Sequence, residues 1–161
     1  PNLDLYIIKG KFQFKQKDYA GAATTFQGAI GQRKTPNGND YYWLGRALYY
    51  NKQYIDADSA FSKLVSMYPE SIQGHFWRAR SNAALDPESK AAAAKPFYEA
   101  TVEKGQADPE KNKAMLIEAY KYLGAYYYQN KKPAESKPYW QKVKELDPKD
   151  EEAANALKVL Q

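Results

Sequence analysis

Residues 40–69 read DYYWLGRALYYNKQYIDADSAFSKLVSMYP and contain two helical patterns separated by a short turn at Asn51-Lys52-Gln53. In both halves apolar residues recur at three- and four-residue steps, the spacing of one face of a helix. They are Tyr41, Leu44 and Leu48 in the first half and Ala57, Phe61 and Leu64 in the second. Gly45 and Ala57 are small, so we expect the two helices to cross closely there. Pro69 ends the second helix, because a proline interrupts helical hydrogen bonding.

Three other stretches of the chain are copies of this pattern. The first copy carries Tyr6, Gly10, Ala22, Phe26 and Ala29 at the places of Tyr41, Gly45, Ala57, Phe61 and Leu64. The fourth restores it with Tyr120, Leu123, Gly124, Trp140, Val143 and a closing Pro148. Four copies in register are much more specific than any one of them.

The third copy is irregular. Ala79 stands at the glycine place, and three additional residues lie within residues 86–91. Asp86-Pro87-Glu88 is a helix-start signal, so we expect a helical turn at this insertion. Eight further residues separate this copy from the fourth within residues 104–114, where Gly105 is a helix-stop signal and Asp108-Pro109 a helix-start signal. The next helix is therefore expected to be long.

The order of an aromatic residue, Leu-Gly, a small residue, an aromatic residue and a closing proline resembles the tetratricopeptide repeat family, in its bacterial type. The resemblance implies an all-α, right-handed α-solenoid of four helix pairs in a single domain over residues 1–161. The expected repeats are residues 3–35, 38–70, 72–107 and 109–149. A last helix over residues 150–161 either caps the stack or begins a fifth repeat.

Nine helices are expected, with ends uncertain by a few residues. They cover residues 3–15, 19–33, 39–51, 54–67, 71–84, 91–104, 109–129, 134–146 and 150–160.

Composition bounds the class of protein. The 161 residues carry a net charge of +5 and no cysteine, which excludes disulfides and thiolate metal sites. No apolar run approaches the ~20 residues that a bilayer-spanning helix needs. Because Pro1 is not a natural start, we expect a fragment of a longer protein. The tyrosine- and lysine-rich style resembles repeat proteins of the bacterial periplasm or cell envelope.

Catalytic patterns are missing from the sequence. The chain has one histidine, and His75 falls on the inward face of its helix, where we expect a packed, hydrogen-bonded side chain. No phosphate-binding glycine loop, HExxH or calcium-loop pattern is present. We expect a chain that is not an enzyme and has no metal or cofactor. An enzyme with a scattered carboxylate pair is the competing interpretation.

The family resemblance implies a groove that binds a peptide, lined by the residues one place after the core positions. After the glycine place come Lys11, Arg46 and Arg80, and then Ala125. After the first aromatic place come Ile7, Tyr42, Phe76 and Lys121, and four residues beyond the glycine place stand Phe14, Tyr49, Ala83 and Tyr128. The expected peptide-binding set is Ile7, Lys11, Phe14, Lys15, Tyr42, Arg46, Tyr49, Phe76, Arg80, Lys121 and Tyr128.

Repeated cations beside aromatic residues favour a scaffold or adaptor whose partner is a protein or peptide with carboxylates. Three alternatives remain open. The arginines could instead stack on neighbouring tyrosines or pair with carboxylates of the chain itself. The chain could be a nucleic-acid-binding repeat, although its pI of about 9.1 only reaches the threshold for a basic domain. The outer face of the first helix could also pair weakly with a second copy, as in a homodimer.

Overall fold

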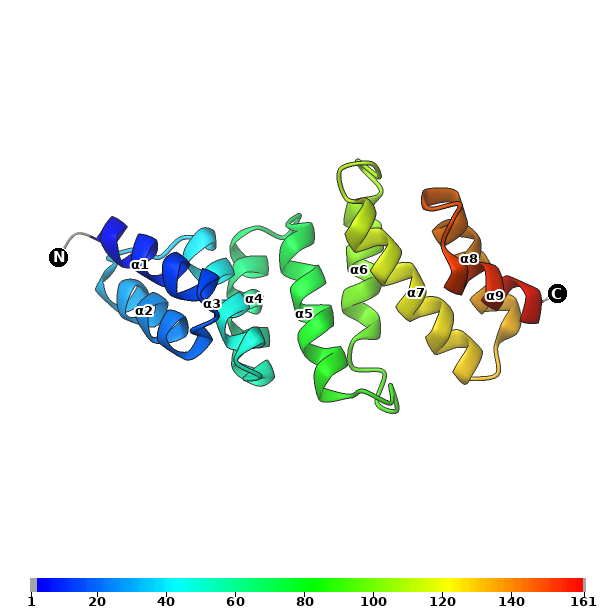
Figure 1. Cartoon of the computed structure of the whole chain (residues 1–161), viewed down its shortest axis with the longest axis horizontal. Coiled ribbons are helices and arrows are strands. Elements are labelled where there is room, and N and C mark those ends of the chain that lie inside the picture. Colours follow the sequence, from blue (N-terminus) through cyan, green and yellow to red (C-terminus); the bar gives the residue numbers. More distant parts are fainter. Residues whose placement is uncertain (1–2, 161) are drawn as a thin grey trace. The chain divides into compact units, whose positions relative to one another are not determined.

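The computed structural model describes residues 3–160, which form nine α-helices and no strand (Figure 1). The helices are α1 (Leu3–Lys15), α2 (Tyr19–Gln32), α3 (Gly38–Tyr50), α4 (Tyr54–Met67), α5 (Ile72–Leu85), α6 (Lys95–Gly105), α7 (Lys113–Gln129), α8 (Pro133–Leu146) and α9 (Glu151–Val159). The all-α repeat fold of the solenoid type predicted from the sequence is therefore confirmed. None of these helices is long and apolar enough to cross a membrane.

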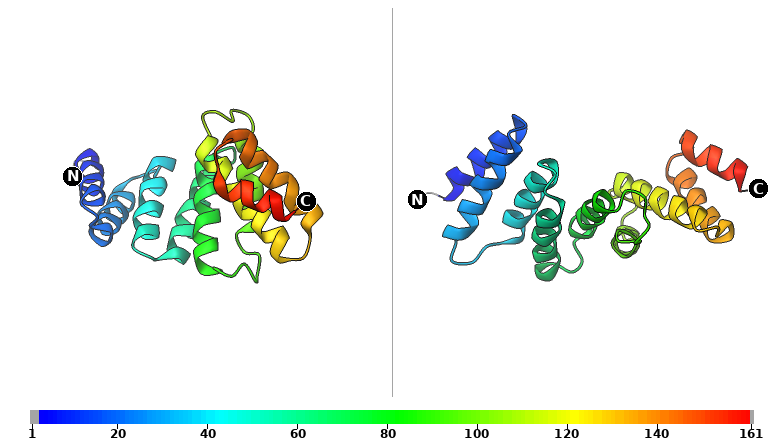
Figure 2. Two further views of the ribbon diagram at one scale, coloured as in Figure 1. Left: turned by 45° about the vertical axis from the view of Figure 1, so that its right-hand side comes forward. Right: turned by 90° about the horizontal axis from the view of Figure 1, so that it is seen from below.

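The chain divides into two compact units, which we call unit 1, ending at Leu85, and unit 2, beginning at Asp86. In unit 1 each helix packs on its neighbours in sequence, and α3 also contacts α1 and α5. In unit 2 α7 packs on α6 and α8, and α8 packs on α9. Figure 2 shows this side-by-side order within each unit from two directions. The helices of the third copy, α5 and α6, thus belong to different units.

An aromatic ring seated on a glycine joins the two helices of copies one, two and four. A Cβ atom added to Gly10 would lie 2.6 Å from the ring of Phe26, and one added to Gly45 would lie 2.6 Å from Phe61. At Gly124 the corresponding distance to Trp140 is 2.7 Å. These distances leave no room for a methyl group. The close crossing predicted at Gly45 is therefore confirmed.

Copies one, two and four share one turn between their helices. Lys17, Lys52 and Lys131 have φ values of 63°, 63° and 57°, the left-handed region that usually takes glycine. In copy two the Gln53 N–H donates to the Leu48 carbonyl and the Lys52 N–H to the Tyr49 carbonyl, both at 2.9 Å. This paired arrangement satisfies the last carbonyls of α3 and reverses the chain within three residues.

The third copy departs from the prediction where its insertion lies. α6 begins at Lys95 instead of residue 91. The Asp86 carboxylate accepts hydrogen bonds from the backbone N–H groups of Lys90, Ala91 and Ala93, and this local pairing replaces the helical one. The sequence predicts a helical turn at the insertion. The structure has a hydrogen-bonded turn there, in which the Ser89 N–H donates to the Asp86 carbonyl at 2.9 Å.

The start of α7 also differs from the prediction. The helix begins at Lys113 instead of residue 109. The Asp108 carboxylate accepts from the Lys111 N–H at 3.2 Å, and the buried Asn112 amide donates to the Gly105 carbonyl at 3.2 Å. These contacts hold the preceding residues in turns. With 17 residues α7 is still the longest helix in the described part of the chain, as its spacing predicted.

An ion-pair network holds α9 on α7 in unit 2. The ammonium of Lys121 lies 2.7 Å from Asp150 and 2.8 Å from Glu152. Burial lowers the pKa of Lys121, but its hydrogen bonds to the two carboxylates outweigh that effect and raise it. Burial likewise raises the pKa of Asp150, but the contacts with Lys121 and with the Ala153 N–H outweigh it and lower it below 3.8.

Gly45→Ala should destabilise the fold by about 1–3 kcal/mol, because the added methyl group would overlap the Phe61 ring. Gly28→Ala is the matched control, since no atom lies within 4 Å of its added Cβ. That control should gain about 0.5–1 kcal/mol from the better helix propensity of alanine. Urea unfolding followed by circular dichroism measures both changes. Equal effects at the two glycines would contradict the close packing of ring on glycine.

Asp150→Asn should lower the free energy of unfolding near neutral pH, with a loss that disappears in acid. A carboxyl group whose folded pKa is depressed stabilises the fold above its unfolded pKa, here 3.8. That contribution falls as the pH drops through the depressed folded pKa, so the two proteins should converge in stability as the pH is lowered below 3.8. Urea unfolding from pH 6 to pH 2 tests this. Glu151→Gln, on the same helix, serves as the control, and a gap that does not narrow as the pH falls below 3.8 would refute the ion-pair explanation.

Candidate functional site

Three cations on α1, α3 and α5 of unit 1 form what we call the cation row, which consists of Lys11, Arg46 and Arg80. Each follows the glycine place of its copy by one residue, so the repeat that builds the core also positions the row. Lys11 lies with its ammonium 4.9 Å from the ring centre of Trp43.

Arg46 is the centre of the row. Its guanidinium carbon lies 4.9 Å from the ring centre of Phe14, 5.2 Å from Trp43 and 5.4 Å from Trp77. Tyr42 adds a fourth ring at 5.5 Å. These distances are those of cation–π contacts, which hold a guanidinium in a fixed place.

The charge of Arg46 is not neutralised within residues 3–160. Its Nε atom is buried and has no hydrogen-bond partner there, and no carboxylate pairs with the guanidinium. Ring contacts cover the faces of a guanidinium, whereas its hydrogen-bond donors lie in the plane. The buried Nε therefore keeps an unused donor.

Arg80 repeats the arrangement on α5. Its guanidinium carbon lies 4.9 Å from the ring centre of Trp77, 5.4 Å from Tyr49 and 5.5 Å from Phe76. The stacking of arginine on tyrosine that we expected as an alternative to a partner site is therefore present for Arg46 and Arg80. Such stacking does not use up the donors of Arg46.

The expected residues of unit 1 divide into two groups. Four of them are aromatic and contact the arginines. Phe14 and Tyr42 contact Arg46. Tyr49 and Phe76 contact Arg80. Ile7 and Lys15 lie on α1, the first half-buried and the second exposed. Sequence reasoning missed two tryptophans of the site. Trp43 contacts Lys11 and Arg46, and Trp77 contacts Arg46 and Arg80. A signal for them exists, because each stands two residues before the glycine place of its copy.

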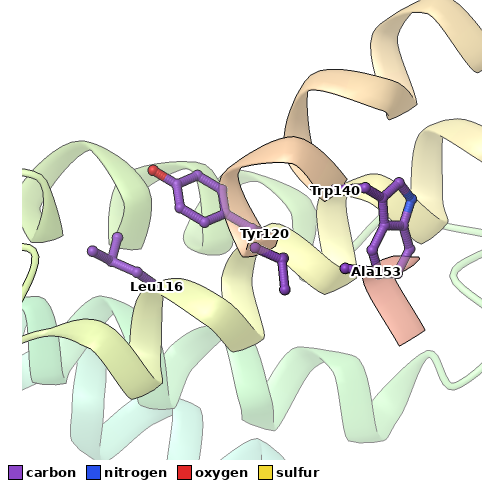
Figure 3. Packing of buried hydrophobic residues seen from close by; sticks show 5 residues of the cluster. Leu116, Tyr120, Trp140 and Ala153 are labelled. Atoms are coloured by element: carbon purple, nitrogen blue, oxygen red, sulfur yellow. The ribbon is translucent and has the colours of Figure 1, made fainter. Parts of the chain in front are cut away.

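The two expected residues of unit 2 lie in a different environment. Lys121 is held by Asp150 and Glu152, so its charge is compensated. Tyr128 is half exposed at 50% and lines a pocket together with residues of α8 and α9. The core of unit 2 contains Leu116, Tyr120, Trp140 and Ala153, which belong to one buried cluster (Figure 3).

His75 is hydrogen-bonded, as its place in the sequence predicted. Its Nε2 atom lies 2.8 Å from the Pro69 carbonyl oxygen, which accepts the imidazole N–H, and its side chain is half-buried. Among residues 3–160 no three histidine, aspartate or glutamate side chains are grouped as a metal site would require.

Comparison with known proteins places the chain among repeat proteins. The sequence pattern of the tetratricopeptide repeat matches residues 117–150. The C-terminal part of a TPR repeat-containing protein from Cytophaga hutchinsonii is 36% identical over 96% of this chain, with a TM-score of 0.90. The present chain spans only 60% of that solved chain. No curated protein sequence matches.

More distant solved structures share the fold alone. MamA from Desulfovibrio magneticus RS-1 is 21% identical over 98% of this chain and 82% of its own, with a TM-score of 0.78. YrrB, described as a TPR protein with an unusual peptide-binding site, is 18% identical over 98% of this chain and 75% of its own, with a TM-score of 0.74.

Repeats of this fold generally mediate contacts between proteins and are typically non-catalytic scaffolds. The match at residues 117–150, the identity to the Cytophaga protein and the ring-on-glycine packing agree with one another. On these grounds the chain belongs to the tetratricopeptide repeat family.

Proposed function

We propose that the chain is a non-catalytic scaffold and that the cation row of unit 1 binds an acidic peptide segment of a partner protein. The observation that supports this most is the state of Arg46. Its guanidinium is held among four rings, and its buried Nε has no acceptor within the described residues. A carboxylate of a partner supplies the acceptor that this group lacks.

Repetition supports the same proposal. Packing of rings on glycines requires a small residue at Gly10 and Gly45, but it does not require a cation one residue later. A cation nevertheless occurs there three times in unit 1. An exposed ion pair contributes only about 0.2–1 kcal/mol. Rings that exclude water strengthen a charge-assisted hydrogen bond to about 1.5–3 kcal/mol.

An open pocket of about 460 Å³ lies beside the row, because Tyr42, which contacts Arg46, also lines it. Tyr42, Leu64 and Tyr68 form its apolar part, and Asn37, Asn39 and Ser71 form its polar part. An apolar side chain of a partner could contact these rings, and binding energy at protein interfaces concentrates in a few such contacts. The preferred partner segment therefore combines carboxylates with one large apolar side chain.

Nucleic acid is the competing ligand, because cations and aromatic rings also bind phosphates and bases. Arg33, one of the cations outside the row, already forms an ion pair with Asp40 at 2.9 Å. A nucleic-acid reader would depend on Lys9 and Lys17 as much as on the row, and its affinity would fall steeply with salt.

Lys11→Gln and Arg46→Gln should each weaken binding of an acidic peptide, and Arg46→Gln should do so by about tenfold, the equivalent of 1.4 kcal/mol. Lys11 is exposed, so its variant should keep the melting temperature, whereas Arg46→Gln should lower melting slightly because it loses ring contacts. Lys63→Gln, at an exposed place on α4, is the control.

Fluorescence anisotropy with acidic, neutral and basic peptides and a single-stranded oligonucleotide, at two salt concentrations, measures these affinities. Equal binding of acidic and basic peptides, or a Lys11→Gln variant that binds like the parent, would rule out the acidic-peptide site.

We also propose that two molecules of this protein associate weakly as a homodimer through α1. Leu5, Ile8 and Phe12 form a strip on this helix and are exposed by 61%, 62% and 63%. An antiparallel pair of α1 helices places Leu5 of one molecule opposite Phe12 of the other, with Ile8 near the centre. The same orientation brings Asp4 near the basic end of the partner helix at Lys15, so the charges are complementary.

Ile8→Asp should abolish this pairing, because it puts a carboxylate at the centre of the apolar strip. Ile55→Asp is the control, since Ile55 is similarly exposed at 69% but lies on α4. Static light scattering over a range of concentrations reports the mass. A parent protein that stays monomeric at every concentration would disprove the pairing.

A further inference from the structure

Unit 2 contains a pocket of about 690 Å³ between α7, α8 and α9. Ala125 of α7, Trp140 of α8 and Ala156 of α9 line its apolar part, together with the 67%-exposed Val159. Glu151 and Glu152, at the start of α9, line its edge. A volume of this size accommodates a large side chain with its neighbours.

The pocket exists because two large residues of unit 1 have small counterparts in unit 2. Ala125 follows Gly124 as Arg46 follows Gly45, so it takes the place of the central cation. In unit 1 the place two residues before the glycine position carries a tryptophan, Trp77 on α5. When the pattern matched by residues 117–150 is continued for one further repeat, the position on α9 that corresponds to Trp77 is occupied by Ala156. An arginine and a tryptophan that fill the surface in unit 1 are thus replaced by two methyl groups.

The charge around this pocket is opposite to that of the cation row. The ammonium of Lys121 is shared between Asp150 at 2.7 Å and Glu152 at 2.8 Å. Glu151 is exposed and has no ion-pair partner within residues 3–160. A second ammonium, that of Lys144, also interacts electrostatically with Asp150, so the three carboxylates Asp150, Glu151 and Glu152 outnumber the two cations beside them. The edge of the pocket carries an excess of negative charge, which attracts a cation and repels an anion.

We infer that this pocket is a second peptide site, which takes a large apolar side chain directly flanked by lysine or arginine. The apolar walls receive the side chain above Trp140, and the adjacent cation lies against Glu151 at the edge. The inference does not depend on the cation row, because all the residues that carry it belong to unit 2. The chain then has two peptide sites of opposite charge preference, one in each unit.

The test uses labelled peptides with blocked ends, in which one phenylalanine is flanked by two lysines. In two matched peptides glutamates replace the lysines or serine replaces the phenylalanine. Anisotropy titrations with the full chain should show the strongest binding for the lysine-flanked phenylalanine. Ala125→Trp should abolish that binding by filling the pocket. Glu151→Lys should weaken it by about fivefold, the upper end for an exposed ion pair.

Two controls separate this site from other effects. Glu110→Lys makes the same charge change at an exposed place of unit 2 outside the pocket lining and should leave the affinity unchanged. Arg46→Gln should also leave it unchanged, so failure of the cation row and failure of this pocket are distinguishable. If Ala125→Trp does not fold by circular dichroism, Glu151→Lys decides alone. Equal affinity for lysine- and glutamate-flanked peptides, or equal weakening by Glu110→Lys and Glu151→Lys, would overturn the inference.

Discussion

The seating of an aromatic ring on a glycine is the constraint on which the rest of the structure depends. It recurs at Gly10, Gly45 and Gly124, where a methyl group would come within 2.7 Å of a ring carbon or nitrogen. Because the second helix is held by this contact, the faces of the first helix take fixed directions. The third copy has Ala79 at that place, and it is also the copy whose two helices belong to different compact units.

Tryptophan residues connect the core to the surface of unit 1. Trp43 stacks on Phe26, with ring centres 6.2 Å apart, and lies 5.2 Å from the Arg46 guanidinium carbon. Trp77 stacks on Phe61 at 5.8 Å and contacts Arg80 as well. The same rings therefore stabilise the stack of helices and hold the cations in place. The residues that position the cations are therefore part of the packing beneath the surface.

Much of the fold could be predicted from the sequence because its main determinants are local. The glycine, the ring and the apolar spacing lie within one repeat, so Gly45 and Phe61 reveal their contact by position alone. The start of α6 could not be predicted this way. It depends on whether Asp86 caps a helix or binds the N–H groups of a loop, and both choices satisfy similar hydrogen bonds.

The candidate sites were less predictable than the fold. The cation row follows from a place that repeats, but Trp43 also contacts Lys11, and Trp77 also contacts Arg46, from a neighbouring helix, and that geometry is set by how the repeats stack. The role of Lys121 depends on Asp150 and Glu152, which stand about thirty residues later in the chain. The pocket of unit 2 is harder still to predict from the sequence, because it is the space left by the small side chains of Ala125 and Ala156.

The residue that follows the glycine can be substituted without changing the packing of the two helices. This residue lies outside the ring-on-glycine contact, so a change from Arg46 to the alanine found at Ala125 alters what the surface presents without altering the helix crossing. The residue that determines the helix crossing and the residue that determines the surface side chain are thus adjacent in the sequence and can be substituted independently. A designer could keep one stack of helices and rewrite its preference for charge repeat by repeat.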